Sequence, residues 1–260
     1  MGMSRVEGFV RPRTGMARAF LVGLLAACGG KTTYDPWLTP QQDFAGTVHA
    51  MAVVSVEPPD DLEDPTPVEA TFDSLLIAEL VGAGFRVVSS QVTGDLWGGL
   101  VDSVGGYYDP FTGRQDTSKY NPLRRAWMRI LREEHGADAV LFPSIVVVDA
   151  GVSDWKASWD GTSQRVQSIF SAALRAIAGE ENAATTPALS LEVQIEDMDG
   201  EVVYVNRGGI EVWEKPASGR GEGYREVPRS ELFRDAERNT RAVRLALGSI
   251  LTGNAVAQGK

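Results

Sequence analysis

One apolar run, from Asp138 to Val148, constrains the fold of this chain more than any other segment. After the aspartate it reads Ala-Val-Leu-Phe-Pro-Ser-Ile-Val-Val-Val, with one hydroxyl and no charge. A strand with one face in water alternates apolar and polar residues, whereas a strand buried on both faces is apolar throughout. The run therefore predicts a strand covered on both faces, in which Pro143 marks a bulge or an edge segment.

Strands and helices alternate around this run in the first half of the chain. Thr47–Val56 predicts a first strand, because apolar residues occupy both of its faces. A first helix is expected to have Thr66 as its N-cap, with Pro67 in the first helical position and Glu69 completing a capping box. A second helix repeats the order of cap and proline at Asn121.

The second half of the chain predicts antiparallel hairpins and a last helix. Asp160-Gly161 and Asp199-Gly200 separate alternating segments, and Asp-Gly is a preferred hairpin turn. Ser230 is expected to cap a C-terminal helix whose buried residues include Val243 and Leu247. The complete order predicts an α/β fold, with a mixed β-sheet flanked by helices, late antiparallel hairpins and a C-terminal helix.

Cys28, the only cysteine, predicts a covalent lipid anchor. It ends a Leu-Ala-Ala-Cys run that follows a basic N-terminal region and a short apolar stretch. These three features form a secretory signal. The tetrapeptide resembles the bacterial lipobox, whose cysteine takes a diacylglycerol and becomes the new N-terminus. We therefore expect lipidation of Cys28 and no disulfide, the alternative being an unmodified thiol in an ordinary secretory signal.

The expected domain organisation follows from this processing site. Residues 1–27 would be the signal peptide, residues 28–46 the lipidated cysteine with a flexible tether, and residues 47–260 a single globular α/β domain. Trp37 and Phe44 could dock the far end of the tether on that domain. Removing the signal peptide, with four arginines and one glutamate, changes the net charge from −10 to −13. We expect no nucleic acid partner and no electrostatic attraction to anionic lipid.

Residues 89–120 lack an apolar period and hold six glycines, so a long loop is expected there. Tyr107, Tyr108 and Phe111 would be its rigid aromatic anchors and would bind a partner protein. On this interpretation, changing all three to alanine leaves the melting curve nearly unchanged. The alternative is that these aromatics fold back onto the sheet, which is the expectation for Trp97.

The chain offers no strong catalytic or metal motif. Its two histidines, His49 and His135, are far apart in sequence, and Gly-x-Ser-x-Gly is absent. We therefore expect neither a Ser-His-Asp arrangement nor a zinc site. The segment 196–201 resembles a fragment of a calcium loop, but a hairpin turn is the expected structure. No catalytic residue, metal or cofactor is predicted.

Three short phrases carry a resemblance to a known family. They are Ala-Gly-Phe-Arg-Val-Val at 83–88, Gly-Ala-Asp-Ala-Val-Leu at 136–141 and Leu-Glu-Val-Gln-Ile-Glu-Asp-Met-Asp-Gly-Glu-Val-Val-Tyr at 191–204. With the order of elements, they resemble bacterial envelope lipoproteins of the CsgG, LpoB and TolB-amino-terminal-domain kind, over most of residues 47–213. The resemblance implies a non-enzymatic part of an envelope assembly and supplies no catalytic residue.

The expected function combines this resemblance with the anchor. Gly29 after the cysteine resembles the outer-membrane default, so we expect a lipid-anchored protein of the outer membrane, facing the periplasm and binding other envelope proteins. An extracytoplasmic small-ligand binder or hydrolase, with a pocket at the strand ends, is the alternative. A ring-forming export channel ranks last, because no convincing pair of membrane hairpins is present.

Overall fold

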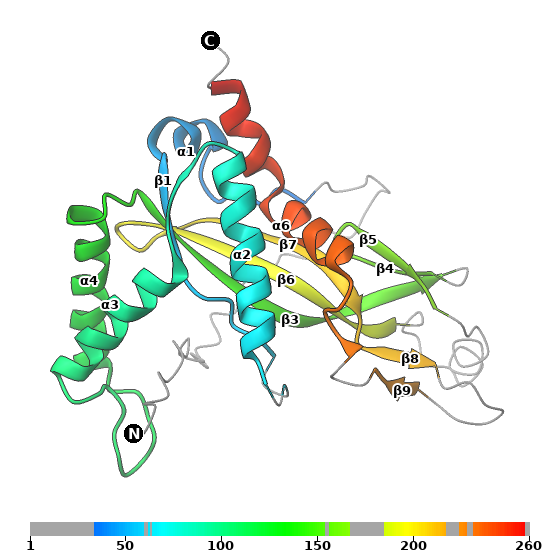
Figure 1. The fold of residues 1–260 in the computed structure, drawn as a ribbon, viewed down its shortest axis with the longest axis horizontal. Helices are drawn as coiled ribbons and strands as arrows, with labels where there is room; N and C mark the ends of the chain where they lie inside the picture. Colours follow the sequence, from blue (N-terminus) through cyan, green and yellow to red (C-terminus); the bar gives the residue numbers. More distant parts are fainter. Residues whose placement is uncertain are drawn as a thin grey trace, which may run out of the picture.

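The long strand predicted from the apolar run is the centre of a mixed sheet (Figure 1). The structure is a computed structural model that describes residues 34–59, 62, 64–153, 156–166, 185–216, 224–227 and 231–257. In chain order, its elements are α1 (Gln41–Thr47), β1 (Ala50–Val53), α2 (Thr66–Gly82), β2 (Arg86–Val88), α3 (Ser90–Ser103), α4 (Thr117–Glu133), β3 (Ala139–Ser153), β4 (Lys156–Trp159), β5 (Thr162–Arg165), β6 (Thr185–Asp197), β7 (Val202–Val212), β8 (Glu214–Pro216), β9 (Tyr224–Glu226) and α6 (Ala236–Ala257).

Among the described residues, seven strands form this sheet, and its pairing confirms the predicted fold class. β1 pairs in parallel with both β2 and β3. β6 runs antiparallel to β3 along most of its length, and β7 runs antiparallel to β6. The β4–β5 hairpin, which turns at Asp160-Gly161 as predicted, pairs with the end of β3. The C-terminal helix α6 packs on β7.

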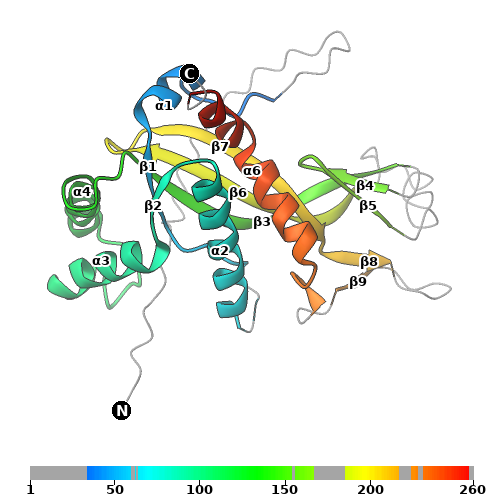
Figure 2. The same cartoon turned by 45° about the horizontal axis from the view of Figure 1, so that its top comes forward.

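Helices cover both faces of the parallel part of the sheet, as the apolar run predicted. Met51 and Val53 of β1 lie in a core with α2 and α6, whereas Ala52 and Val54 lie in a second core with α3 and α4. β3 alternates in the same way between these two cores. In Figures 1 and 2, α2 and α6 lie across one face of the sheet.

Pro143 interrupts the pairing of β3 on one side only. The β1 ladder ends where Val53 meets Leu141, and pairing resumes at a single bridge between Glu57 and Ser144. Pro143 has no N–H to donate and lies in this gap, while its carbonyl accepts from the N–H of Glu57 at 3.0 Å. The irregularity predicted at Pro143 is therefore a short gap in the pairing between β3 and the chain that follows β1. On its other side, β3 pairs with β6 without interruption.

The prediction of a long loop over residues 89–120 is wrong, because α3 occupies residues 90–103 and α4 begins at Thr117. Glycines make α3 a poor helix former by propensity. Packing stabilises it instead, since Trp97 is buried with its ring edge-on to that of Trp127, and the indole of Trp127 donates to the Thr93 carbonyl at 3.0 Å. The loop that remains covers residues 104–116.

Three helices begin away from their expected caps. α2 begins at Thr66 itself, whose N–H donates to Asp64 at 3.2 Å. α4 begins one turn before the predicted position, with Asp116 as its cap and Pro122 inside the helix. α6 begins at Ala236, after Asp235 accepts from two backbone N–H groups, and the expected cap Ser230 lies outside the described residues.

The expected tether docks on the sheet. Trp37 forms an antiparallel bridge with Tyr204 of β7, and its indole donates to Ser249 of α6 at 2.8 Å. Trp37 and Phe44 contact each other and the main core, so their expected docking is confirmed. The expectation of an irregular segment up to residue 46 is wrong at α1, where burial of Phe44 holds the chain against α6.

Helix α6 lies directly on the backbone of β7. A Cβ atom at Gly208 would stand 2.0 Å from the carbonyl oxygen of Ala242, far inside van der Waals contact. Beside it, a β-bulge opposite Leu189 and Ser190 shifts the register of β7 against β6. Only glycine permits this close approach.

We predict that Gly208→Ala destabilises the fold by about 3 kcal/mol, because helix and strand must separate to admit one methyl group. Thermal melts followed by circular dichroism measure the effect. Gly99→Ala is the control, since no atom lies within 4 Å of that Cβ and alanine favours the helix by up to about 1 kcal/mol. Equal melting temperatures for the two variants would contradict the packing described above.

Candidate functional site

Residues 104–116 form an ordered turn, here called the aromatic turn, between α3 and α4. Tyr108 and Gln115 pair as an antiparallel bridge, and the N–H of Asp109 donates to the Arg114 carbonyl at 2.8 Å. Gly113, with a φ of +64°, closes the tip by donating to the Asp109 carbonyl at 2.8 Å. The turn is therefore a small hairpin with Phe111 at its tip.

The carboxylate of Asp109 organises this tip. It accepts hydrogen bonds from the backbone N–H groups of Phe111 at 2.8 Å and Thr112 at 3.0 Å. These bonds favour the ionised form and lower the pKa of Asp109. The tip is thus held by a charged group that stays ionised at neutral pH, and Phe111 projects from a defined backbone.

The three predicted anchor residues do not share one environment. Phe111 is 96% exposed and Tyr108 is 38% exposed, but Tyr107 is only 5% exposed. The ring of Tyr107 packs against those of Trp97 and Tyr120 at centroid distances of 5.7 and 5.4 Å, and burial raises its pKa. The interpretation of Tyr107 as a partner-binding anchor is therefore wrong, because its ring belongs to the core between α3 and α4.

A groove, here called the arginine groove, runs between α4 and the turn that joins β6 to β7. Its volume is about 370 Å³. α4 contributes four arginines that recur on adjacent turns of the helix, and the β6–β7 turn forms the opposite wall. The lining residues are Asn121, Arg124, Arg125, Met128, Arg129, Arg132, Glu133, Met198, Asp199 and Gly200.

Two of these arginines form ion pairs with residues of β6 and the β6–β7 turn, and two do not. Arg124 pairs with the buried carboxylate of Glu196, and Arg132 pairs with Asp199 at 3.0 Å. Arg125 and Arg129 are exposed, and neither forms an ion pair with any described residue. The groove therefore presents two arginines one helical turn apart without an ion pair in the described part of the chain, and the exposed Glu133, four residues after Arg129, leaves the lining with more basic than acidic residues.

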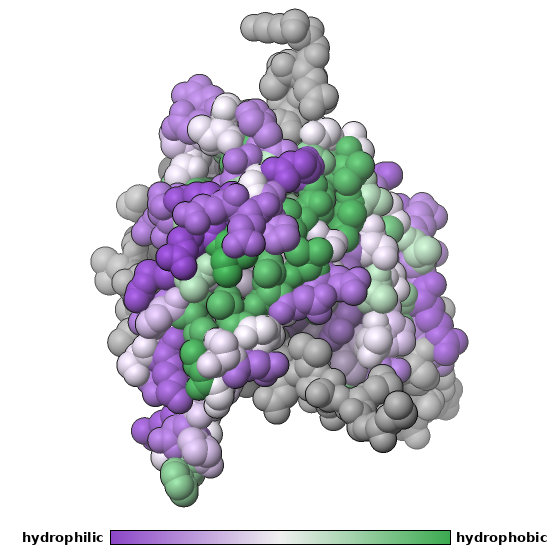
Figure 3. Space-filling model, turned by 60° about the vertical axis from the view of Figure 1, so that its left-hand side comes forward, coloured by the Kyte–Doolittle hydropathy of each residue, from purple (hydrophilic) through white to green (hydrophobic). Residues whose placement is uncertain are grey.

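An apolar band crosses the face of the molecule that carries α2 and α3, with hydrophilic residues beside it (Figure 3). Val81 at the end of α2 is exposed, and Leu96 and Leu100 of α3 are half-buried. Phe111 of the aromatic turn is a further exposed apolar side chain. Single exposed apolar residues are common, whereas a continuous band marks a surface that can bind another molecule.

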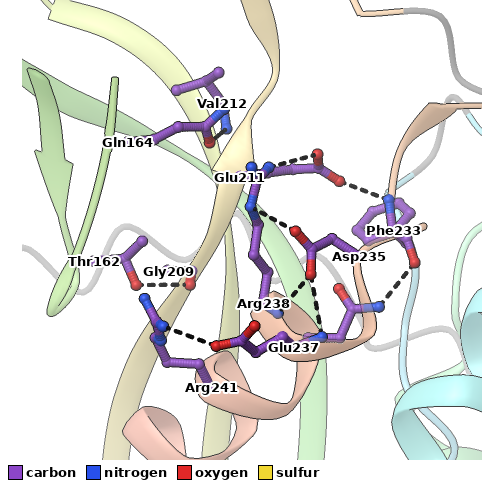
Figure 4. A network of polar contacts seen from close by, with 11 residues as sticks. Thr162, Gln164, Gly209, Glu211, Val212, Phe233, Asp235, Glu237, Arg238 and Arg241 are labelled. Carbon is purple, nitrogen blue, oxygen red and sulfur yellow. Dashed lines mark hydrogen bonds and ion pairs between the residues drawn. The ribbon is translucent and has the colours of Figure 1, made fainter. Parts of the chain in front are cut away.

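A polar network joins β7 to the start of α6 (Figure 4). The buried Glu211 accepts from the N–H of Phe233 at 2.6 Å, and Arg238 lies 3.8 Å from this carboxylate and 3.0 Å from Asp235. Asn239 donates to the Phe233 carbonyl at 2.8 Å. Phe233 has a φ of +62°, so the network holds a strained residue at the entry to α6, and we interpret it as structural.

The remaining predicted features give no further site. Cys28 and the signal peptide lie outside the described residues, so their lipidation and cleavage stay predictions. In the part of the chain that the structure describes, no group of three histidine, cysteine, aspartate or glutamate residues is placed to hold a metal ion. Of the helices described, none is both long and apolar enough to cross a membrane.

Comparison with known proteins does not identify a family. No family model and no curated protein matches the chain. Solved structures that are similar to it include the PelC dodecamer from Paraburkholderia phytofirmans, with 13% identity over 83% of this chain and 92% of that chain and a TM-score of 0.32. The hypothetical protein CT253 from Chlamydia trachomatis has 12% identity, covers 80% of this chain and 99% of that chain, and gives a TM-score of 0.36. Similarities this low carry no argument about function.

The arginine groove is the feature that sequence reasoning missed. Its signal was present, because Arg125, Arg129 and Arg132 recur at helical spacing in a chain with 35 acidic and 25 basic residues. The helix that carries them was expected, but the β6–β7 turn that faces it comes from residues 198–200, far along the chain.

We predict that Tyr107→Ala destabilises the fold by about 3 kcal/mol, because it empties a buried aromatic site. Phe111→Ala, at the tip of the same turn, should change stability by less than about 0.5 kcal/mol. Thermal melts of the two single variants separate the core role from the surface role. A melting temperature for Tyr107→Ala equal to that of the unmodified chain would contradict the assignment of this residue to the core.

Proposed function

We propose that this chain is a lipid-anchored, non-enzymatic protein of the bacterial envelope that binds other envelope proteins. The observation that carries the proposal is Phe111, a large aromatic side chain held almost completely in solvent at the tip of an ordered turn. Aromatic side chains on preorganised backbone are typical of protein-binding surfaces, because little entropy is lost when they are buried by a partner.

The geometry of the N-terminal segment is consistent with an anchor at Cys28. The described chain begins at Tyr34, and residues 36–38 pair with the free edge of β7 through Leu38 N–H to Val203 carbonyl and Val205 N–H to Pro36 carbonyl, both at 3.0 Å. The six residues from Cys28 to Tyr34 span at most about 20 Å when extended. A lipidated Cys28 would therefore hold the sheet close to the membrane surface.

The proposed location is the outer membrane, with the domain in the periplasm. This part of the proposal rests on the lipobox, on Gly29 and on the resemblance to envelope lipoproteins. The resemblance itself stays a prediction. A binding role fits two features of the described surface, the aromatic turn with its exposed Phe111 and the arginine groove.

We predict that Cys28→Ser abolishes lipidation and releases the protein from the membrane fraction, because serine has no thiol to accept the diacylglycerol. Incorporation of labelled palmitate and fractionation of the envelope measure the two effects. Ser55→Ala, a change of one atom outside the lipobox, serves as the control and should leave both labelling and fractionation unchanged. Equal labelling of Cys28→Ser and the unmodified chain would overturn the anchor.

We predict that a photoreactive benzoylphenylalanine in place of Phe111 crosslinks to an envelope protein in intact cells. The same residue in place of Val147, which is 54% exposed on the sheet, is the control for non-specific capture. Gel electrophoresis after irradiation should show an adduct that is specific to position 111. Identical adducts at both positions, or none at position 111, would remove the observation on which the proposed function depends.

A further inference from the structure

We infer that the arginine groove binds an acidic segment of a partner protein, with Arg125 and Arg129 pairing to two of its carboxylates. This inference deepens the proposed function and rests on it, because it names the chemistry of the partner. The ligand class follows from the charge, the spacing and the floor of the groove.

The charge of the groove is local and unbalanced. Elsewhere on the described surface, Arg207 pairs with Glu192 at 2.6 Å and Arg244 pairs with Glu79 at 2.8 Å. Arg125 and Arg129 have no such partner among the described residues, although acids outnumber basic residues in the chain. Glu133, four residues after Arg129, is the one acid of the lining that forms no ion pair with a described residue, so it offsets only part of the repulsion between the two arginines. The groove keeps an excess of positive charge, which favours an anionic ligand.

The spacing of the two cations favours an extended anion over a single phosphate. Residues i and i+4 of a helix are about 6 Å apart along its axis. Carboxylates on alternate residues of an extended peptide are about 6.6 Å apart, and those one turn apart on a helix are about 6 Å apart. A phosphate site instead gathers its donors around one point, as at helix N-termini and arginine forks. Here the two arginines are spaced one turn apart along α4.

The floor of the groove suits a peptide that also has an apolar side chain. Met128 of α4 and Met198 of the β6–β7 turn line the groove and are largely buried, and methionine adapts to ligands of different shape. An acidic peptide with one apolar residue between its carboxylates would place that residue on the thioethers. A free polyanion with no apolar part would leave this surface unused.

The wall opposite α4 is fixed before any ligand binds. Gln194 donates to Glu196 at 2.9 Å, and Glu196 in turn pairs with Arg124. Asp197 accepts from the N–H groups of Asp199 and Glu201, both at 2.9 Å, which closes the β6–β7 turn. A preorganised wall reduces the entropy lost on binding.

The test uses the full chain in mild detergent and a fluorescein-labelled peptide with the repeat Glu-Leu-Glu-Leu-Glu, followed by fluorescence anisotropy. We expect saturable binding that weakens as sodium chloride rises, and at least about tenfold weaker binding to the double variant Arg125→Glu with Arg129→Glu, since attraction becomes repulsion at two positions. If this variant fails to fold, Arg125→Gln with Arg129→Gln replaces it, and binding about threefold weaker or more is expected.

A matched control comes from the β4–β5 hairpin, where Lys156 and Arg165 are exposed and face each other across the strands. Lys156→Glu with Arg165→Glu changes the net charge by the same amount and exchanges one like-charged pair for another, so binding should change by less than twofold. Equal losses of peptide affinity in both double variants would show that net charge alone causes the effect, and would overturn the proposed site.

The competing ligands are outcomes of the same assay. Failure of the peptide to bind overturns the inference, and so does stronger competition by inorganic triphosphate, by polygalacturonate or by phosphatidylglycerol vesicles than by unlabelled peptide. These failures leave the Phe111 crosslink and the Cys28→Ser fractionation unaffected. If the crosslink at position 111 is absent while the peptide still binds, the proposed function is contradicted, but the groove is still a binding site for anions.

Discussion

The contact between α6 and the backbone of β7 is the constraint on which the rest of the fold depends. Gly208 lets the helix lie against the strand, and Tyr204 and Asn206 then donate to the carbonyls of Ala246 and Leu245 at 2.9 and 3.0 Å. These carbonyls precede Gly248, whose φ of +36° departs from helical geometry. Burial raises the pKa of Tyr204 to about 12, so its hydroxyl remains a neutral donor in any physiological medium.

The same helix and strand also hold the chain that leads toward Cys28. Trp37 reaches Ser249 of α6, Gln41 donates to the Ser249 carbonyl at 3.2 Å, and residues 36–38 extend the sheet beyond β7. An uncovered edge strand could pair with another chain, and here the N-terminal segment occupies part of that edge. A force on the N-terminal segment would therefore act first on β7 and α6, to which residues 36–41 are hydrogen-bonded.

The opposite side of the parallel strands is organised differently. There α3 and α4 are joined through buried aromatic rings, and Trp97, Tyr107 and Trp127 fill the space between them. This packing fixes the base of the aromatic turn and leaves the outer face of α4 to solvent. The surfaces that we propose to bind partners thus lie on a rigid base, which is the arrangement that places functional groups accurately.

The sequence by itself determined the elements whose pattern is local. The buried strand after Asp138, the turns at Asp160-Gly161 and Asp199-Gly200, and the apolar faces of α2 and α6 follow from periodicity and turn chemistry, which act between residues close in the chain. The lipobox at Cys28 is a local pattern too, and remains a prediction of the same kind.

Only the tertiary structure decided the features that depend on distant residues. α3 forms in spite of its glycines because Trp97 finds a buried site beside Trp127, and Tyr107 leaves the surface for the same reason. The arginine groove needs α4 and a turn more than sixty residues further along the chain. No local pattern contains these contacts, because packing free energy arises only when separate segments meet.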